Sequence, residues 1–235
     1  MEKVLYLLDA GDGTSGDALR GRLVDDVAPR LLTSGAHRVQ VNVMDSGVEA
    51  AAASRLRSGT GPCPDAMVSL WVDSANGPLR AAYDEVVREV DAGFAAYLVT
   101  ESAPLPGEPV DGRRAGYTQV SFLQRPERLD QQAWLGHWHD HHTQVAIHTQ
   151  ATTRYLQNLV VRPLTPGAPP CAAIVEETFP LAAMTDPSVF FDAPGDVVRQ
   201  KANVDALMAS LMAFLDFDLI DVVPTSEYAV SRRQD

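Results

Sequence analysis

Residues 128–161 read RLDQQAWLGHWHDHHTQVAIHTQATTRYLQNLVV, a stretch that predicts one long helix followed by a strand. Asp130 is placed to cap the helix, because its carboxylate can accept a hydrogen bond from a backbone N–H of the first turn. No proline occurs within the stretch. At about 100° of rotation per residue, Trp134, Trp138 and His142 fall on one side of this helix. A face with two tryptophans should be buried, and it takes an imidazole with it.

This pattern resembles the signature of the EthD-domain family, in which two aromatic residues and a histidine recur every four residues before an Arg-Tyr-x-Gln-Asn motif. The matching residues are Trp134, Trp138, His142, Val145, Arg154, Tyr155, Gln157 and Asn158. The resemblance implies a fold of the dimeric α+β barrel superfamily, whose members pair two ferredoxin-like units. It implies much less about a reaction.

The first half of the chain repeats the same arrangement. Leu19, Leu23 and Val27 lie on one face of a predicted helix, at the spacing of the two tryptophans and the histidine. In the first half we predict strands over 3–8, 37–44, 66–72 and 95–101 and helices over 17–32 and 78–91. In the second half we predict strands over 117–123, 154–163, 172–179 and 219–227 and helices over 130–152 and 196–215.

Each half therefore has the order β-α-β-β-α-β, which is the ferredoxin-like arrangement. The predicted fold class is α+β: two tandem ferredoxin-like repeats that pack into an α+β barrel and so bury their sheet faces. We assign residues 1–101 to the first repeat, 102–116 to a Pro/Gly-rich connector and 117–235 to the second, EthD-like repeat.

The bulk composition excludes some classes of partner. The formal net charge is −12 and the sequence pI is about 4.8, which argues against nucleic acid and anionic membranes as partners. No apolar run approaches the roughly 20 residues of a membrane span, and the N-terminal stretch does not resemble a signal peptide. Cys63 and Cys171 form no recognisable disulfide framework. We predict a cytoplasmic protein, either a monomer that acts as a pseudo-dimer or a homodimer.

His142 is the candidate catalytic residue. A histidine on an apolar helix face is more often part of the core, but the first half has Val27 at the equivalent position. This asymmetry modestly favours a role as general acid or base near neutral pH, and it leaves a core role about equally open.

Four further residues are candidates for substrate binding. Trp134 and Trp138 can line an apolar pocket or simply fill the core, and Tyr155 can bind a ligand or pack. His141 neighbours His142 on the same predicted face.

No metal or cofactor is predicted. His137, His141 and His148 share a helix face near Asp140, but the chain lacks HExxH and any thiolate partner for them. The loop over residues 11–17, GDGTSGD, lacks the lysine of a phosphate loop.

Three functions stay open. The first is an enzyme that acts on a hydrophobic aromatic or polyketide-like carbonyl compound through acid/base chemistry at His142, by dehydration, cyclisation, isomerisation or cofactor-free oxidation. The second is a non-catalytic protein that binds such a compound or assists an oxidoreductase. The third is a structural or oligomerisation module. A cavity with an inward imidazole favours the first two, whereas a filled barrel favours the third.

Overall fold

Eight antiparallel strands close into a barrel in the computed structural model, which describes residues 1–231. Around the barrel the order is β2-β3-β1-β4-β7-β8-β6-β9, and β9 pairs with β2 to close it. The strands are β1 (Glu2–Leu8), β2 (Arg38–Val43), β3 (Ala66–Val72), β4 (Ala95–Leu105), β6 (Tyr117–Leu123), β7 (Arg154–Pro163), β8 (Ala173–Phe179) and β9 (Ile220–Val230). A short strand, β5 (Gly112–Arg113), pairs with Tyr228 and Ala229 of β9, beyond the part of β9 that pairs with β6.

Two seams join the halves of the chain. At one seam β4 pairs with β7, with Val99 opposite Val160; at the other, β2 pairs with β9 from Val39 to Val43. Both seams satisfy the backbone groups of strands that would otherwise be sheet edges.

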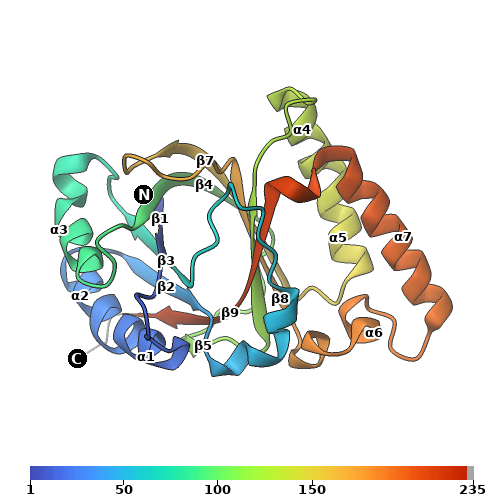
Figure 1. The fold of residues 1–235 in the computed structure, drawn as a ribbon, viewed down its shortest axis with the longest axis horizontal. Helices are drawn as coiled ribbons and strands as arrows, with labels where there is room; N and C mark the ends of the chain where they lie inside the picture. Colours follow the sequence, from blue (N-terminus) through green and yellow to red (C-terminus); the bar gives the residue numbers. More distant parts are fainter. Residues whose placement is uncertain (232–235) are drawn as a thin grey trace.

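Helices cover two opposite sides of the barrel (Figure 1). One layer is α1 (Gly16–Gly21), η1 (Arg22–Val27), α2 (Ala28–Thr33) and α3 (Gly77–Arg88). The other is α4 (Gln131–His137), η3 (Trp138–His142), α5 (Thr143–Thr149) and α7 (Val197–Phe214). Shorter helical turns are η2 (Ser46–Ser54), η4 (Leu181–Met184), α6 (Pro187–Phe190) and η5 (Phe217–Leu219).

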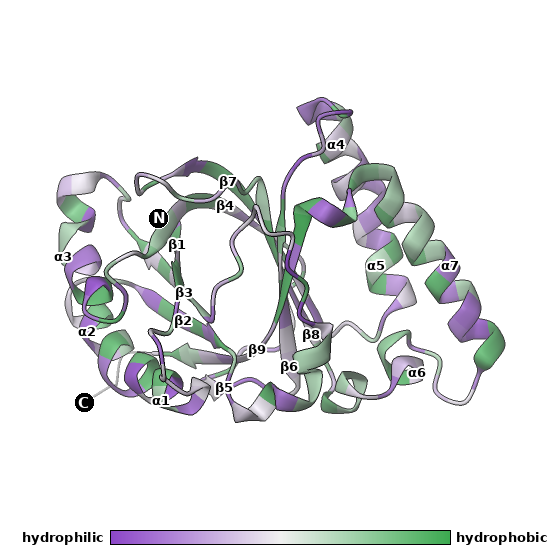
Figure 2. Ribbon diagram, in the orientation of Figure 1, coloured by the Kyte–Doolittle hydropathy of each residue, from purple (hydrophilic) through white to green (hydrophobic). Residues whose placement is uncertain are grey.

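Each helical layer packs on the barrel through an apolar face. Leu19, Leu23 and Val27 are buried against the outer face of the first four strands, as the sequence predicts. Hydrophilic and hydrophobic residues intermingle along α3, α5 and α7 (Figure 2), as expected for helices with one face on the barrel and one in solvent. Within residues 1–231 no helix is both long and apolar enough to cross a bilayer.

The barrel interior is filled with side chains. One part is apolar and holds residues from both halves, among them Leu5, Tyr97 and Phe122. The other part holds buried charges: the Nζ of Lys3 lies 3.0 Å from a carboxylate oxygen of Glu176 and 2.6 Å from one of Glu101.

A second ion pair extends this interior network. Arg154 Nη1 lies 2.7 Å from Glu227 and 3.6 Å from Glu176. Burial alone would raise the pKa of Glu176, but Lys3 and Arg154 together hold that pKa below its usual value.

Most predicted elements lie where the sequence places them, but several boundaries differ, including the helix predicted to reach residue 91, which ends at Arg88. The predicted connector 102–116 is partly strand, because β4 continues to Leu105 along β7 and β5 pairs with β9. The helix predicted to reach residue 152 ends at Thr149. The last predicted strand runs on to Val230, because its final residues close the barrel against β2.

Candidate functional site

A cavity of about 190 Å³ lies between the outer face of the barrel and the second helical layer. An engineered cavity of about 150 Å³ in another protein binds benzene, so this volume suits a ligand of one or two rings. Its polar lining residues are Gln119, Ser121, Trp138, His142, Gln150, Tyr155 and Glu177. Its apolar lining residues are Leu56, Leu123, Val175, Phe190, Leu207, Leu211, Phe214, Leu215, Phe217, Ile220 and Val222. Such a mainly apolar space with a few polar groups is typical of small-molecule sites.

The helix that carries His142 begins as the sequence predicts. The Asp130 carboxylate accepts a hydrogen bond of 2.8 Å from the backbone N–H of Ala133. At Trp138–His142 the helix widens into a π turn, in which the N–H of Thr143 bonds to the carbonyl of Trp138 five residues earlier. Such turns are frequent at functional sites. The first half has one too, at Arg22–Val27, so the widened turn alone does not make a site.

His142 lies at the wall of the cavity and is only 6% exposed. Its ring centroid is 4.6 Å from that of Phe214, and its Nδ1 is 3.0 Å from the hydroxyl oxygen of Ser210. Burial, followed by electrostatic interaction with the neighbouring His137 and His141, lowers the pKa of His142 to about 3. The imidazole is therefore neutral at pH 7, and the expectation that its pKa lies near neutrality is not met.

The hydrogen bonds around Ser210 are compatible with a His142 tautomer that carries its proton on Nε2. His137 Nε2 is 3.0 Å from the carbonyl oxygen of Ser210, which can only accept, so this nitrogen is protonated. The same N–H points at the Ser210 hydroxyl oxygen, 3.4 Å away. When the Ser210 hydroxyl donates to His142 Nδ1, the proton of the neutral imidazole is on Nε2.

Trp138 and Tyr155 meet at the same cavity. The indole N–H of Trp138 donates to the Tyr155 hydroxyl across 3.3 Å, and both side chains are fully buried. Burial, followed by the nearby Glu177 carboxylate, raises the pKa of Tyr155 well above its usual value. Tyr155 is thus a neutral phenol that can donate a hydrogen bond.

Trp134 and His141 do not line the cavity. Trp134 is buried next to Trp138, with ring centroids 5.4 Å apart, and its indole nitrogen has no partner among residues 1–231. His141 is exposed, and its ring centroid is 5.0 Å from that of His137. For these two residues substrate binding stays a prediction without a contact to the cavity. Trp138, His142 and Tyr155 are the predicted residues that the structure brings together.

Glu177 is a residue of the cavity that the sequence interpretation missed. It lies on β8, opposite Tyr155 of β7 and Gln119 of β6, and is 9% exposed. Its Oε1 has no hydrogen-bond partner within the described chain. Burial raises the pKa of Glu177 to about 7. A signal was available: two adjacent acids in an otherwise apolar strand must point to opposite faces, so one of them had to face the helices.

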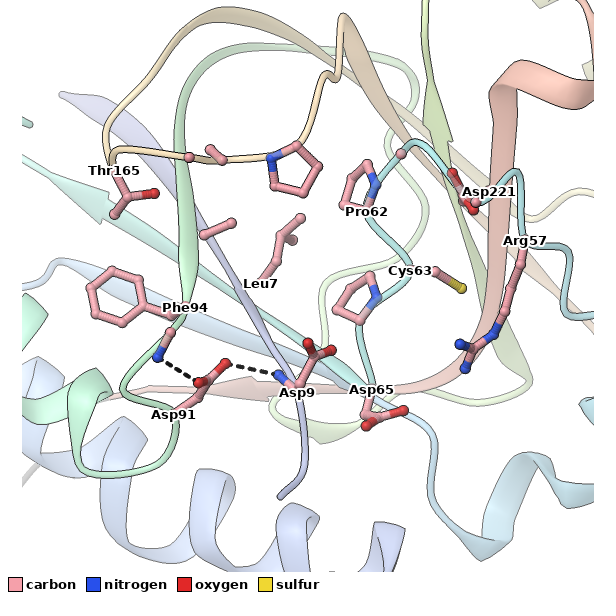
Figure 3. A pocket seen from close by; sticks show the side chains of 18 of the residues that line it. Leu7, Asp9, Arg57, Pro62, Cys63, Asp65, Asp91, Phe94, Thr165 and Asp221 are labelled. Atoms are coloured by element: carbon pink, nitrogen blue, oxygen red, sulfur yellow. Dashed lines mark hydrogen bonds between the residues drawn. The ribbon is translucent and has the colours of Figure 1, made fainter. Parts of the chain in front are cut away.

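A larger cavity, of about 580 Å³, lies at one end of the barrel (Figure 3). Two of its acids brace loops. Asp91 accepts from the backbone N–H of Asp9 at 3.0 Å and of Gly93 at 2.7 Å. Asp221 in the same way accepts from the backbone N–H of Ser58 at 2.7 Å. Because these carboxylates already have partners, we place the functional site at the smaller, apolar cavity.

The histidines considered for a metal do not form a three-ligand site: His137 and His141 are neighbours, but both His137 and His148 bind backbone carbonyls. His148 Nδ1 donates to the carbonyl of Gln144 at 2.7 Å, and His137 donates to Ser210. Among residues 1–231 no group of three or more His, Cys, Asp or Glu side chains is arranged to hold a metal ion.

Residues 126–209, which include the helix with His142 and most of α7, match the EthD domain family. These residues in the second half of the chain are similar to the EthD domain. The resemblance predicted from the sequence is thus confirmed for this part of the chain. No curated protein sequence shows significant similarity to the chain.

Two solved structures share the fold of almost the whole chain. The first is of an anthrone oxidase-like protein, with 9% identity, a TM-score of 0.51 and coverage of 97% of this chain and 90% of that chain. The second is of a "putative monooxygenase" from Lactobacillus acidophilus NCFM, with 6% identity, a TM-score of 0.51 and coverage of 98% of this chain and 95% of that chain. At such identities the likeness shows the fold alone.

Proposed function

We propose that the EthD domain binds a small, hydrophobic aromatic or polyketide-like carbonyl compound in the 190 Å³ cavity and moves a proton on it. Dehydration, cyclisation, isomerisation and cofactor-free oxidation are reactions of this type. The observation that carries the proposal is an apolar cavity in which His142, Tyr155 and Glu177 provide polar groups. Apolar walls hold the rings, and a few polar groups orient the carbonyl.

His142 takes part as a neutral imidazole. Ser210 holds its Nδ1, and the proton on Nε2 is then available to a ligand oxygen. For His142 to accept a proton, an anion has to form beside it, because an opposite charge in a dry cavity raises the pKa of an imidazole. Its role as a general acid or base is thus tied to the ligand.

The similar structures favour oxidation among the four reactions. One of them is described as anthrone oxidase-like and the other as a monooxygenase. The volume of the cavity favours a molecule of one or two rings as the ligand.

Non-catalytic binding, including a role as an accessory to an oxidoreductase, is the second candidate function. The same cavity supports it, and turnover separates it from catalysis. A purely structural module is less favoured: the barrel interior is filled, but a cavity with an inward imidazole remains outside it.

We also propose that the chain consists of two fused ferredoxin-like units, residues 1–101 and 117–235, joined by 102–116. Each half has its strands in the spatial order second, third, first, fourth, which supports this division. An isolated 117–235 fragment should form a homodimer, because β7 and β9 would each lose a pairing partner. A folded, monomeric fragment in light scattering would contradict the proposal.

The binding proposal is tested with 2-indanone, a benzene ring fused to a cyclic ketone. Titration should quench the fluorescence of Trp138, and Val175→Phe, which fills the cavity, should abolish the quenching. The matched control is Leu79→Phe on α3, where the side chain is 64% exposed. No quenching in the wild type, or equal quenching in Val175→Phe, would reject the cavity as the site. Conversion of the bound ketone, followed by NMR, then distinguishes an enzyme from a binding protein.

A further inference from the structure

Glu177 is the polar group of the cavity that the fold does not explain. Its neighbours across the sheet, Tyr155 and Gln119, are neutral, and no cation within residues 1–231 compensates its carboxylate. A buried acid without a partner costs stability, so a chain that keeps one in a ligand cavity has a chemical use for it.

We propose that Glu177 is the catalytic base of this cavity, and that its substrates are cyclic aromatic ketones with a removable C–H next to the carbonyl. This inference rests on the proposed function and names its substrate class and its base. In this proposal the aromatic ring of the substrate packs among Leu207, Phe214 and Val222, which line the cavity, and its ketone faces the polar side chains.

The proposed step is balanced and needs no oxidant. The ionised Glu177 carboxylate takes the proton from the carbon next to the carbonyl. The C–H bond breaks, its electron pair moves onto the carbonyl oxygen, and an enolate forms beside a neutral carboxylic acid. Glu177 is suited to this step at neutral pH, because burial brings its pKa to about 7 and so keeps both protonation states accessible.

Two other side chains of the cavity can stabilise the enolate oxygen. The Nε2–H of His142 is oriented by Ser210, and the neutral hydroxyl of Tyr155, which Trp138, Thr143 and Gln157 surround, can donate to the oxygen. Both are neutral donors in a site with little water, where a hydrogen bond to an anion is strong. His142 and Glu177 thereby have different tasks: the imidazole holds the oxygen and the carboxylate moves the proton.

Exchange of the methylene protons of 2-indanone in D₂O tests this step directly. The full-length protein should accelerate the exchange seen by NMR, and Glu177→Gln should slow it at least about 100-fold, which is the usual contribution of a general base. The dissociation constant from fluorescence should change little. Glu85→Gln, an exposed glutamate on α3, serves as the matched control and should behave as wild type.

Two further measurements distinguish loss of the catalytic base from a structural effect of replacing Glu177. The exchange rate of the wild type should rise with pH and level off above about pH 7. In Glu177→Ala, added formate should restore part of the exchange, because a small carboxylate can occupy the space of the lost side chain.

The outcomes separate the two proposals. If 2-indanone binds and Glu177→Gln exchanges as fast as wild type, Glu177 is not the base, and the proposed binding function survives. If wild type does not bind the ketone, the proposed function fails and this inference fails with it. If Glu177→Gln does not fold, ¹³C NMR of the wild-type carboxyl groups decides: a Glu177 resonance that titrates near pH 4.5 overturns the proposal.

Discussion

Glu176 and Glu177 are neighbours on β8, and their surroundings are opposite. Glu176 points into the barrel, where Lys3 lies 3.0 Å away and Gln40 donates to it across 2.5 Å. Glu177 points outward into the cavity and has an oxygen without a partner in the described chain. Both are buried. The interior lowers the pKa of one glutamate and the cavity raises that of the other. Burial alone therefore does not set the direction of a pKa shift, and the presence of a charge partner does.

The largest expected effect is that of Glu176→Gln. This substitution removes the carboxylate that Lys3 and Arg154 share inside the barrel. Removal of one partner from a buried ion pair costs roughly 3–5 kcal/mol, because the other charges stay buried. Urea denaturation at pH 7 measures the loss. A variant within about 1 kcal/mol of wild type would show that the interior network contributes little, and the comparison would fail.

Whereas Glu176→Gln should destabilise the protein, Glu177→Gln should stabilise it at alkaline pH. The pKa of Glu177 is raised from 4.5 to about 7 in the folded protein, so its ionisation above pH 7 opposes folding. The amide has no such cost. The variant should thus be about 3 kcal/mol more stable than wild type at pH 8, and the gain should fall below about 1 kcal/mol at pH 5. The check is urea denaturation of both proteins across this range; a gain that does not depend on pH would mean that Glu177 is not a buried acid.

His142→Gln should differ from wild type by a smaller amount in the free energy of unfolding, and this difference should depend on pH. The pKa of His142 falls from 6.5 to about 3 on folding, so the neutral imidazole stabilises the folded state above pH 6.5 and this contribution is lost as the pH falls. Between pH 8 and pH 5 wild type should lose about 2 kcal/mol relative to His142→Gln. Thermal melting at the two pH values follows this change. Parallel curves would imply that His142 keeps an ordinary pKa and is accessible to water.

The sequence predicts the bounds of an element well where turn and loop residues lie on both sides of it. Ala66–Val72, Tyr117–Leu123 and Arg154–Pro163 begin and end as predicted. The final strand is longer than predicted, because the partner that extends it, β2, lies far away in the sequence. Local patterns carry no information about such a seam.

The candidate site is only partly predictable for a similar reason. Helical spacing and the EthD resemblance find Trp138 and His142, because both depend on neighbours along the helix. The pKa of His142 depends on burial under α7, which supplies Ser210 and Phe214. Glu177 is not predicted, because the sequence alone does not show which of the two adjacent acids, Glu176 or Glu177, lies on the outer face of the sheet.

The seam between β2 and β9 has a consequence for folding during synthesis. β2 emerges from the ribosome early, but its neighbour across this seam is the last described strand of the chain. Until β9 is made, β2 presents an open edge of backbone donors and acceptors, on which another chain can pair. The nascent protein should therefore be most prone to aggregate before β9 is completed, and it should depend most on chaperones at that stage.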